Sequence, residues 1–384
     1  MIKRLVAIAL LVIASVASFA QTDSSHLRIS LLTCGTGEEI WETFGHTAVR
    51  VIDSANHTDN VYNYGTFNGF GDDFELQFMR GKLLYYVSFY PYPSFLEEYS
   101  EYHRSVEEQI LITGGTEKQK IFDYLKNNAL EENRYYKYDF FFDNCATRIR
   151  DIFPKALGNK FTYHNVLPAG HPLTFRNIMD QYFYRVHWER VGCDILLGSR
   201  IDKVMTNADI MFLPDYLRNG LASATVDGKT IVTPTQTILS GSEHKEAGIN
   251  QPFWVMLLVC LLTFIGLAFQ PLKLLGNTMS FLVLFVTGLL GCLIVVMWLG
   301  TDHQGCQNNF NILWALPTNL VLAFAHKRNK SRYALVAIVL LLVSLLLHVL
   351  SIQGLPLLEI GPLLLALLFI YASIYRRSRT SDAA

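Results

Sequence analysis

A histidine and a cysteine are the residues of this chain best suited to chemistry. His46 lies in the segment FGHTAVRV, at the start of a β-branched run, and Cys145 lies in FFFDNCATRIRD, where a strand-like run gives way to a helical one. An imidazole that takes the proton of a thiol lets the sulfur attack an acyl group and form a thioester. The two segments predict a cysteine enzyme if these side chains meet in space, although by periodicity alone each is more often a core residue.

The residues around Cys145 favour a reactive position. Asp143 and Asn144 stand where an N-cap is expected, and they predict a helix over residues 145–152. A helix N-terminus stabilises a thiolate, and its backbone N–H groups can form an oxyanion hole. Asn144 is expected to cap this helix or to help hold the oxyanion, and the capping role is better supported. Arg148, one turn along, is a candidate for binding a phosphate, with a solvated or salt-bridged face as the alternative.

The segment 21–250 is long enough for one domain with a full core, and its patterns predict an α+β fold with an antiparallel sheet. Alternating or β-branched runs predict strands, and apolar residues at helical spacing predict helices. The strands are expected over residues 27–31, 47–52, 61–64, 81–90 and 135–142, and the helices over residues 94–103, 117–130 and 145–152.

Residues 251–384 predict an all-α transmembrane bundle of about five helices. Lys and Arg residues cluster in alternate loops, and by the positive-inside rule this places the C-terminus in the cytoplasm and residues 21–250 outside. Each apolar run approaches the ~20 residues that span a bilayer, and the third and fifth runs are weakest because each holds a proline. The runs are residues 253–269, 279–299, 310–325, 334–352 and 357–375.

Residues 1–20 predict a signal peptide. Lys3 and Arg4 precede an apolar stretch, and Ser18 and Ala20 are small residues at the positions that a signal peptidase reads. An uncleaved anchor of the same orientation is the alternative. The protein is therefore expected in the cytoplasmic (inner) membrane as a multi-pass protein, with its soluble domain in the periplasm.

The net charge and the number of cysteines restrict the possible class of protein further. The formal net charge of −1 gives no basic surface for nucleic acid. Cys34, Cys145 and Cys193 belong to the soluble domain, and Cys306 lies in an expected outer loop. An odd count in an oxidising compartment leaves a free thiol. A Cys34–Cys193 disulfide beside a free Cys145 is one pairing among several that the sequence leaves open.

Several segments match a known family. They are FGHTAVRV, VYNYGTF, MRGKLLYYV, YDFFFDNCATRIRD, TFRNIMDQY, GCDILLGSRID, FLPDYL and TDHQGCQNNFNILWALP. In these segments the chain resembles the Lnb family, the lipoprotein N-acyltransferases of Bacteroidetes. The order of histidine before cysteine is also similar to the circularly permuted papain-like arrangement of lecithin:retinol acyltransferase and of permuted relatives of NlpC-type peptidases.

The resemblance implies a reaction and its participants. An acyl chain would pass from a membrane phospholipid, through a thioester on Cys145, to the α-amine of the diacylglyceryl-cysteine of lipoproteins, with His46 as base and no cofactor. The implied partners are a phospholipid donor, diacylated lipoproteins and the bilayer. In the permuted arrangement the next strand orients the histidine, which makes Asn63 and Tyr64 candidates, with ordinary strand residues as the alternative.

A second polar cluster lies at the outer edge of the expected membrane domain. Asp302, His303, Asn309 and Asn311 are candidates for contacting a phospholipid head group or the lipoprotein amine. Ordinary interfacial residues are the alternative. No metal site is predicted, because Asp302 and His303 have no further obvious ligand beyond Cys306.

Two other functions compete with acyl transfer. A cell-wall amidase or peptidase would use the same Cys–His pair with water as acceptor, but such hydrolases rarely need several membrane spans. A non-catalytic membrane sensor would carry a degenerate enzyme domain, and the intact His46 and Cys145 argue against it.

Overall fold

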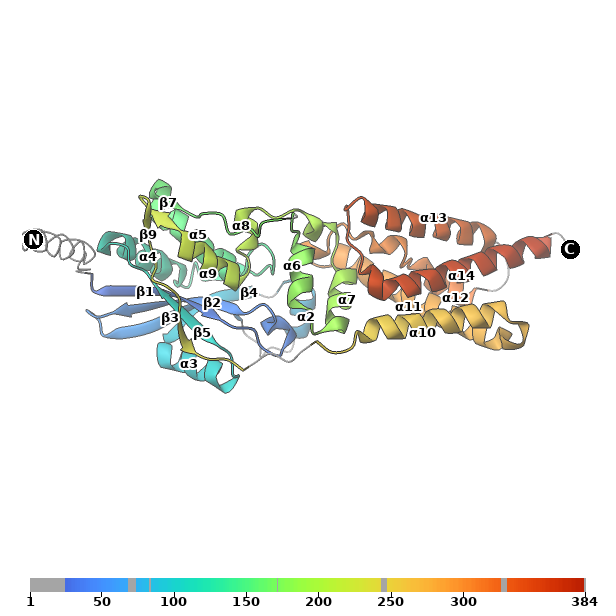
Figure 1. Cartoon of the computed structure of the whole chain (residues 1–384), viewed down its shortest axis with the longest axis horizontal. Coiled ribbons are helices and arrows are strands. Elements are labelled where there is room, and N and C mark those ends of the chain that lie inside the picture. Colours follow the sequence, from blue (N-terminus) through green and yellow to red (C-terminus); the bar gives the residue numbers. More distant parts are fainter. Residues whose placement is uncertain are drawn as a thin grey trace, which may run out of the picture.

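The computed structural model describes residues 25–67, 74–82, 84–170, 172–242, 247–325 and 330–382. Figure 1 shows an elongated molecule with a sheet-containing domain at one end and a bundle of long helices at the other. The expected α+β domain followed by a helical membrane domain is therefore confirmed. The expected signal peptide, residues 1–20, lies outside the described residues.

The soluble domain is built on a seven-stranded sheet in which every pairing is antiparallel. The strand order is β10-β5-β1-β2-β3-β4-β6. The strands are β1 (Leu27–Cys34), β2 (His46–Asp53), β3 (Thr58–Phe67), β4 (Leu84–Pro91), β5 (Val106–Ile110), β6 (Tyr135–Lys137) and β10 (Gln236–Leu239). A small second sheet joins β7 (Phe161–Thr162), β8 (Thr225–Val226) and β9 (Lys229–Thr230).

Helices cover both faces of the large sheet. Alternate residues of β2 point to opposite faces, so Val49 and Val51 belong to the core under α5 (Cys145–Leu157), whereas Ala48 belongs to the core under α3 (Tyr92–Glu101). The other helices of this domain are η1 (Ile40–Glu42), α2 (Phe74–Met79), α4 (Gly115–Asn128), η2 (Gly158–Lys160), α6 (Phe175–Tyr182), α7 (His187–Leu196), η3 (Ser199–Asp202), α8 (Asn207–Ile210) and α9 (Pro214–Ser223).

One predicted strand is shorter than expected. The aromatic run 135–142 pairs with β4 only as far as Lys137. The side chain of Asp139 then accepts the backbone N–H groups of Phe141 and Phe142 at 3.0 and 3.1 Å and turns the chain. This Asx turn ends the strand and directs the chain into α5.

Four helices of the C-terminal domain are long and apolar enough to cross a membrane within the described residues. They are α10 (Gln251–Ala268), α11 (Lys273–Leu299) with the preceding η4 (Gln270–Leu272), α13 (Lys330–Val349) and α14 (Leu357–Asp382). Pro362, which weakened the prediction for the fifth run, lies within α14 without ending it.

The third apolar run differs from the expected long helix. It forms η6 (Phe310–Leu313) and α12 (Thr318–Phe324), separated at Pro317, which has no N–H to continue a helical ladder. These pieces pack closely on α11, where a Cβ at Gly288 would lie 2.4 Å from the Leu320 backbone nitrogen. The bundle therefore accepts a short, broken element because a neighbouring helix covers it.

Buried polar groups join the two domains at the end of α7. Asn309 donates to the carbonyls of Ile195 and Leu196, and Asn311 donates to the carbonyl of Ile195. Arg176 donates to the carbonyl and carboxylate of Asp194. The last carbonyls of α7 are thus satisfied partly by the membrane domain, and we call Arg176, Asn309 and Asn311 the junction clasp.

Candidate active site

The backbone before His46 is unusual and fixes where the histidine begins its strand. Gly45 has a φ of +74°, a conformation that side-chain-bearing residues rarely adopt. A Cβ there would also lie 2.6 Å from the carbonyl oxygen of Cys34 on the neighbouring strand. Glycine at position 45 therefore lets the chain enter β2 with Cys34 directly opposite His46 in the register.

Cys145 lies beside the start of β2. The ladder between β2 and β3 begins only at the pair Val49 and Tyr62, so the backbone N–H of Thr47 has no partner on β3. This N–H instead donates to the sulfur of Cys145, and so do the N–H groups of Cys145 itself and Ala146. The candidate nucleophile therefore lies against the residue that follows His46, at the open end of two diverging strands.

The first turn of α5 is fixed by Asn144. Its Oδ1 accepts the N–H of Thr147 at 2.9 Å, and the Thr147 hydroxyl accepts the N–H of Asn144 at 2.8 Å. The amide nitrogen of Asn144 donates to the carbonyls of Phe140 and Phe212. All polar atoms of this side chain are therefore used in capping and anchoring the helix, and none is directed at an oxyanion.

A chain of hydrogen bonds holds His46. Its Nε2 lies 2.6 Å from Oδ1 of Asn63, and the Asn63 amide nitrogen donates to the hydroxyl of Tyr90 at 3.3 Å. Tyr90 in turn bonds Glu98 of α3. Because the Asn63 oxygen can only accept, Nε2 carries the proton and Nδ1 carries the lone pair. The structure thus supplies a tautomer that leaves Nδ1 as the proton acceptor.

Burial keeps both His46 and Cys145 neutral at rest. Desolvation lowers the pKa of His46 to about 4, although the bond to Asn63 partly opposes the shift. Desolvation also raises the pKa of Cys145 to about 11, against the lowering effect of the backbone N–H groups around the sulfur. The thiol of Cys145 therefore holds its proton much more tightly than the imidazole of His46 does, and no thiolate–imidazolium pair is favoured at rest.

A second buried thiol and a buried arginine lie behind the pair. Cys34 bonds Tyr99, and burial raises its pKa to about 12. Arg104 donates to the carbonyl of Gly35 and to Glu42, the last residue of η1, at 3.0 and 2.9 Å. Arg104 therefore ties the loop before His46 to the end of β1.

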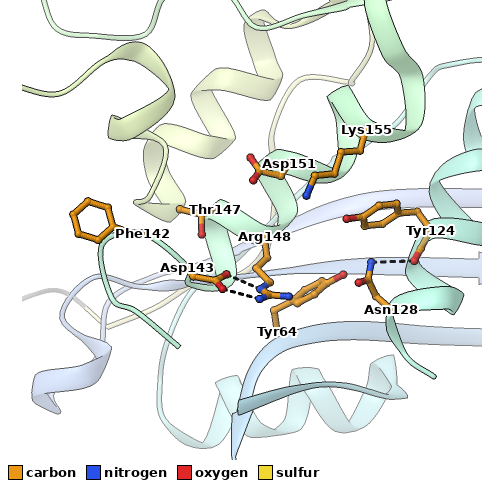
Figure 2. A pocket seen from close by; sticks show the side chains of 9 residues that line it. All are labelled: Tyr64, Tyr124, Asn128, Phe142, Asp143, Thr147, Arg148, Asp151 and Lys155. Atoms are coloured by element: carbon orange, nitrogen blue, oxygen red, sulfur yellow. Dashed lines mark hydrogen bonds and ion pairs between the residues drawn. The ribbon is translucent and has the colours of Figure 1, made fainter. Parts of the chain in front are cut away.

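Tyr64 and Arg148 lie apart from His46, around a cavity of about 310 Å³ between α4, α5 and β3. Figure 2 shows this cavity, with the Arg148 guanidinium between Asp143 and Tyr64. Arg148 makes two bonds of 2.6 Å to Asp143 and stacks on the ring of Tyr136. Of the two candidates for orienting His46, only Asn63 bonds it in the structure.

The polar cluster at the membrane edge divides into two groups. Asp302 pairs with Lys137 of β6 at 3.1 Å, which lowers the pKa of Asp302, and His303 lies 3.2 Å from the carbonyl oxygen of Met79. These residues are near the soluble domain. Asn309 and Asn311 are instead fully buried in the junction clasp, where their amides bond backbone carbonyls and Trp314.

All six cysteines are described and all are unpaired. Cys34 bonds Tyr99, and because both cysteines are free, the Cys34–Cys193 pairing is absent. Burial raises the pKa of Cys306 to about 12, and the neighbouring Cys193 adds to this shift. Among the described residues, no group of three or more His, Cys, Asp and Glu side chains is placed to hold a metal ion.

Four neighbours of the site were not indicated by any sequence pattern: Thr47, Tyr90, Glu98 and Arg104. Thr47 contributes only its backbone, which no side-chain pattern reveals. Tyr90 and Glu98 reach the histidine through β3 and α3, far along the chain. The one available signal was that Glu98 and Arg104 are charged residues flanking apolar positions of a short predicted helix.

The fold and site define a multi-pass membrane protein whose α+β domain carries a histidine on a strand and a cysteine at a helix N-terminus. Two family models match the chain: the Lnb N-terminal periplasmic domain over residues 15–181 and the Lnb transmembrane domain over residues 244–381. The chain therefore belongs to the Lnb family, with a periplasmic domain and a transmembrane domain. No curated protein and no solved structure matches it.

Proposed function

We propose that this protein is a lipoprotein N-acyltransferase of the cytoplasmic membrane, with its C-terminus in the cytoplasm. One observation carries the proposal: the Cys145 sulfur accepts the Thr47 N–H, beside a histidine whose tautomer Asn63 sets. A candidate nucleophile, a candidate base and a residue that orients the base therefore lie on one domain that is attached to the membrane helices. The matched periplasmic and transmembrane models support the same assignment.

The first half-reaction forms a thioester. The Cys145 sulfur attacks the carbonyl of an acyl ester in a membrane phospholipid while Nδ1 of His46 takes the thiol proton. Backbone N–H groups of the first turn of α5 stabilise the oxyanion. The ester C–O bond then breaks, and the proton on His46 passes to the departing lysophospholipid alkoxide.

The second half-reaction transfers the acyl group. The α-amine of a diacylglyceryl-cysteine attacks the thioester carbonyl, His46 accepts a proton from the amine, and the C–S bond breaks. The proton then returns to the sulfur, so the enzyme regains its neutral pair. An amide is more stable than a thioester, and transfer therefore runs in the forward direction.

Replacement of Cys145 tests the proposal. Cells that depend on this protein and carry Cys145→Ala are expected to accumulate diacylated lipoproteins, detected by mass spectrometry of lipoprotein N-termini. A matched variant, Cys292→Ala in α11, removes a thiol far along the chain from the pair and is expected to keep triacylation. Triacylated lipoproteins in the Cys145→Ala cells would refute acyl transfer through this thiol, and digestion of isolated peptidoglycan by the purified protein would favour the hydrolase instead.

A further inference from the structure

The cavity between α4, α5 and β3 has a polar lining that the reaction does not use. Its volume of about 310 Å³ is at the lower end of the range of small-molecule sites. Figure 2 shows the hydroxyl of Tyr64 and the ammonium group of Lys155 directed toward its interior. Arg148 approaches from the N-terminal half of α5.

The unsatisfied groups of this cavity are hydrogen-bond donors. Tyr64 is 2% exposed, and its buried hydroxyl has no hydrogen-bond partner among the described residues. Lys155 makes no ion pair with any carboxylate in the described part of the chain. A buried hydroxyl without a partner is unfavourable, so a ligand that accepts from Tyr64 recovers the lost free energy.

The two carboxylates of the cavity each accept from an arginine. Both oxygens of Asp143 accept from Arg148, and Oδ1 of Asp151 accepts from Arg150 at 2.8 Å. Asp143 holds Arg148 through Nε and Nη2, which leaves Nη1, on the opposite edge of the guanidinium, without a hydrogen-bond partner in the part of the chain that the structure describes. A ligand with several acceptor oxygens and a negative charge therefore fits the lining better than a donor or a cation.

We propose that this cavity binds the phosphodiester of a glycerophospholipid, through Tyr64, Arg148 and Lys155. The inference rests on the proposed function, since it places the head group of the acyl donor. Arg148 follows Cys145 by three residues on α5, a spacing that puts two helical side chains about 5–6 Å apart at Cβ. In a glycerophospholipid the acyl ester and the phosphate are likewise separated only by glycerol carbons.

Binding of a head group without acyl chains tests the site directly. Calorimetry on the full-length protein in a phosphate-free maltoside detergent would use glycerophosphoethanolamine as the phosphodiester probe and inorganic phosphate as the comparison. We expect Tyr64→Phe and Lys155→Gln each to weaken binding of the diester about tenfold, the loss expected for one hydrogen bond to a charged group. The matched controls are Tyr135→Phe, which loses only an exposed bond to Glu131, and Lys160→Gln, which loses an exposed pair with Asp227.

The outcomes separate the two sources of phosphate. Binding of the diester that the two cavity variants weaken and the two controls preserve supports the proposal. Binding of inorganic phosphate alone would assign the cavity to a free anion and overturn the lipid assignment. Absence of binding, or equal losses in the control variants, would overturn it as well. A thermal unfolding curve for each variant confirms that the protein is folded.

Kinetics separate this inference from the proposed function. Tyr64→Phe is expected to raise KM for a phospholipid donor about tenfold and to leave the reaction with an uncharged nitrophenyl acyl ester unchanged. An equal loss with both donors would contradict a head-group role. Cys145→Ala is expected to lose acyl transfer and to keep diester binding, so acyl transfer by Cys145→Ala would refute the proposed function without removing the binding result.

Discussion

At the scale of single residues, the site is organised around two neutral side chains that are both buried away from water. His46 has its pKa lowered and Cys145 has its pKa raised, each mainly by desolvation. This arrangement differs from a preformed thiolate–imidazolium pair, because neither charge is present before a substrate arrives. A thiol in this state resists oxidation, since the thiolate is the reactive form.

The pH profile follows from these shifts. A base must be unprotonated to act, so kcat/KM for acyl transfer is expected to fall on the acid side only near pH 4, the pKa of His46 in the free enzyme. An unperturbed histidine would give this fall near pH 6.5. Initial rates from pH 4 to 8 with a water-soluble acyl ester measure it, and a midpoint at or above 6.5 would contradict a buried, neutral histidine.

Asn63→Asp tests whether Asn63 orients His46, because this substitution is expected to shift the pKa of His46 in a known direction. A carboxylate at this position favours the imidazolium, so the pKa of His46 rises and the acid limb moves up by about 1–3 pH units. Asn63→Ala removes the bond and is expected to lower kcat without raising the acid limb. Tyr135→Phe serves as the control, because Tyr135 is exposed and its hydroxyl bonds only Glu131. An unmoved limb in Asn63→Asp would show that Asn63 does not act on the histidine.

The residue level was only partly predictable from the sequence. His46 and Cys145 stood out because their neighbours mark a strand start and a helix N-cap. The choice between Asn63 and Tyr64 required the structure, since adjacent strand residues point to opposite faces and the face toward His46 depends on register. Asn309 and Asn311 resembled interfacial ligands, but their burial in the junction depends on contacts with α7 that no local pattern shows.

At the scale of elements, α5 depends on its cap. Asn144→Ala removes the bond to Thr147 and leaves the carbonyls of Phe140 and Phe212 without their donor. We expect this variant to lose about 2–4 kcal/mol of unfolding free energy and most acyl-transfer activity, because the first turn also positions the sulfur. Chemical denaturation in detergent micelles measures the first effect. Asn144→Asp, which keeps the capping oxygen, is expected to lose less, and equal losses would contradict the capping role.

Arg176 is the charged member of the junction clasp. It is 4% exposed and bonds both Asp194 and Asp202. Arg176→Leu leaves two buried carboxylates without their cation, so we expect a loss of about 3–5 kcal/mol and earlier proteolysis near α7. Limited proteolysis with a thermal unfolding curve checks this, and the loss is expected to shrink at low pH as Asp194, whose pKa burial raises, becomes protonated. A variant as stable as the parent would show that other contacts hold the junction.

Some elements escaped prediction for a physical reason. Strand β5 has the sequence VEEQI, which does not alternate as a half-buried strand should. Its Glu108 is 2% exposed because Arg28 and Arg50 bond its carboxylate across the sheet, at 3.2 and 3.3 Å. A pattern of apolar and polar residues cannot reveal a buried charge whose partners lie on other strands.

At the scale of the whole molecule, the order of the helices makes topology testable. The proposed orientation puts Lys229 in the periplasm and Leu274, at the start of α11, at the cytoplasmic face. We expect Lys229→Cys, but not Leu274→Cys, to react with an impermeant maleimide on intact spheroplasts, and both to react after permeabilisation. The parent chain measures background from its six cysteines. The opposite pattern would invert the proposed topology.

The bundle was easier to predict than the soluble domain, because length and hydropathy alone identify membrane helices. The run 310–325 shows the limit of that rule. Its apolar composition is suited to a span, but Pro317 breaks it into η6 and α12, and packing against Gly288 of α11 compensates. Whether a short helix is tolerated is decided by its neighbours and not by its own sequence.

The junction clasp fixes the distance between the soluble domain and the membrane helices. The bonds from Asn309 and Asn311 to the carbonyls of α7 hold the soluble domain at one height above the membrane helices. Under the proposed function, His46 and Cys145 would then reach carbonyls and amines in one narrow layer of the interface. A single inserted helical turn, about 5.4 Å, is expected to move them out of that layer without changing a residue of the site.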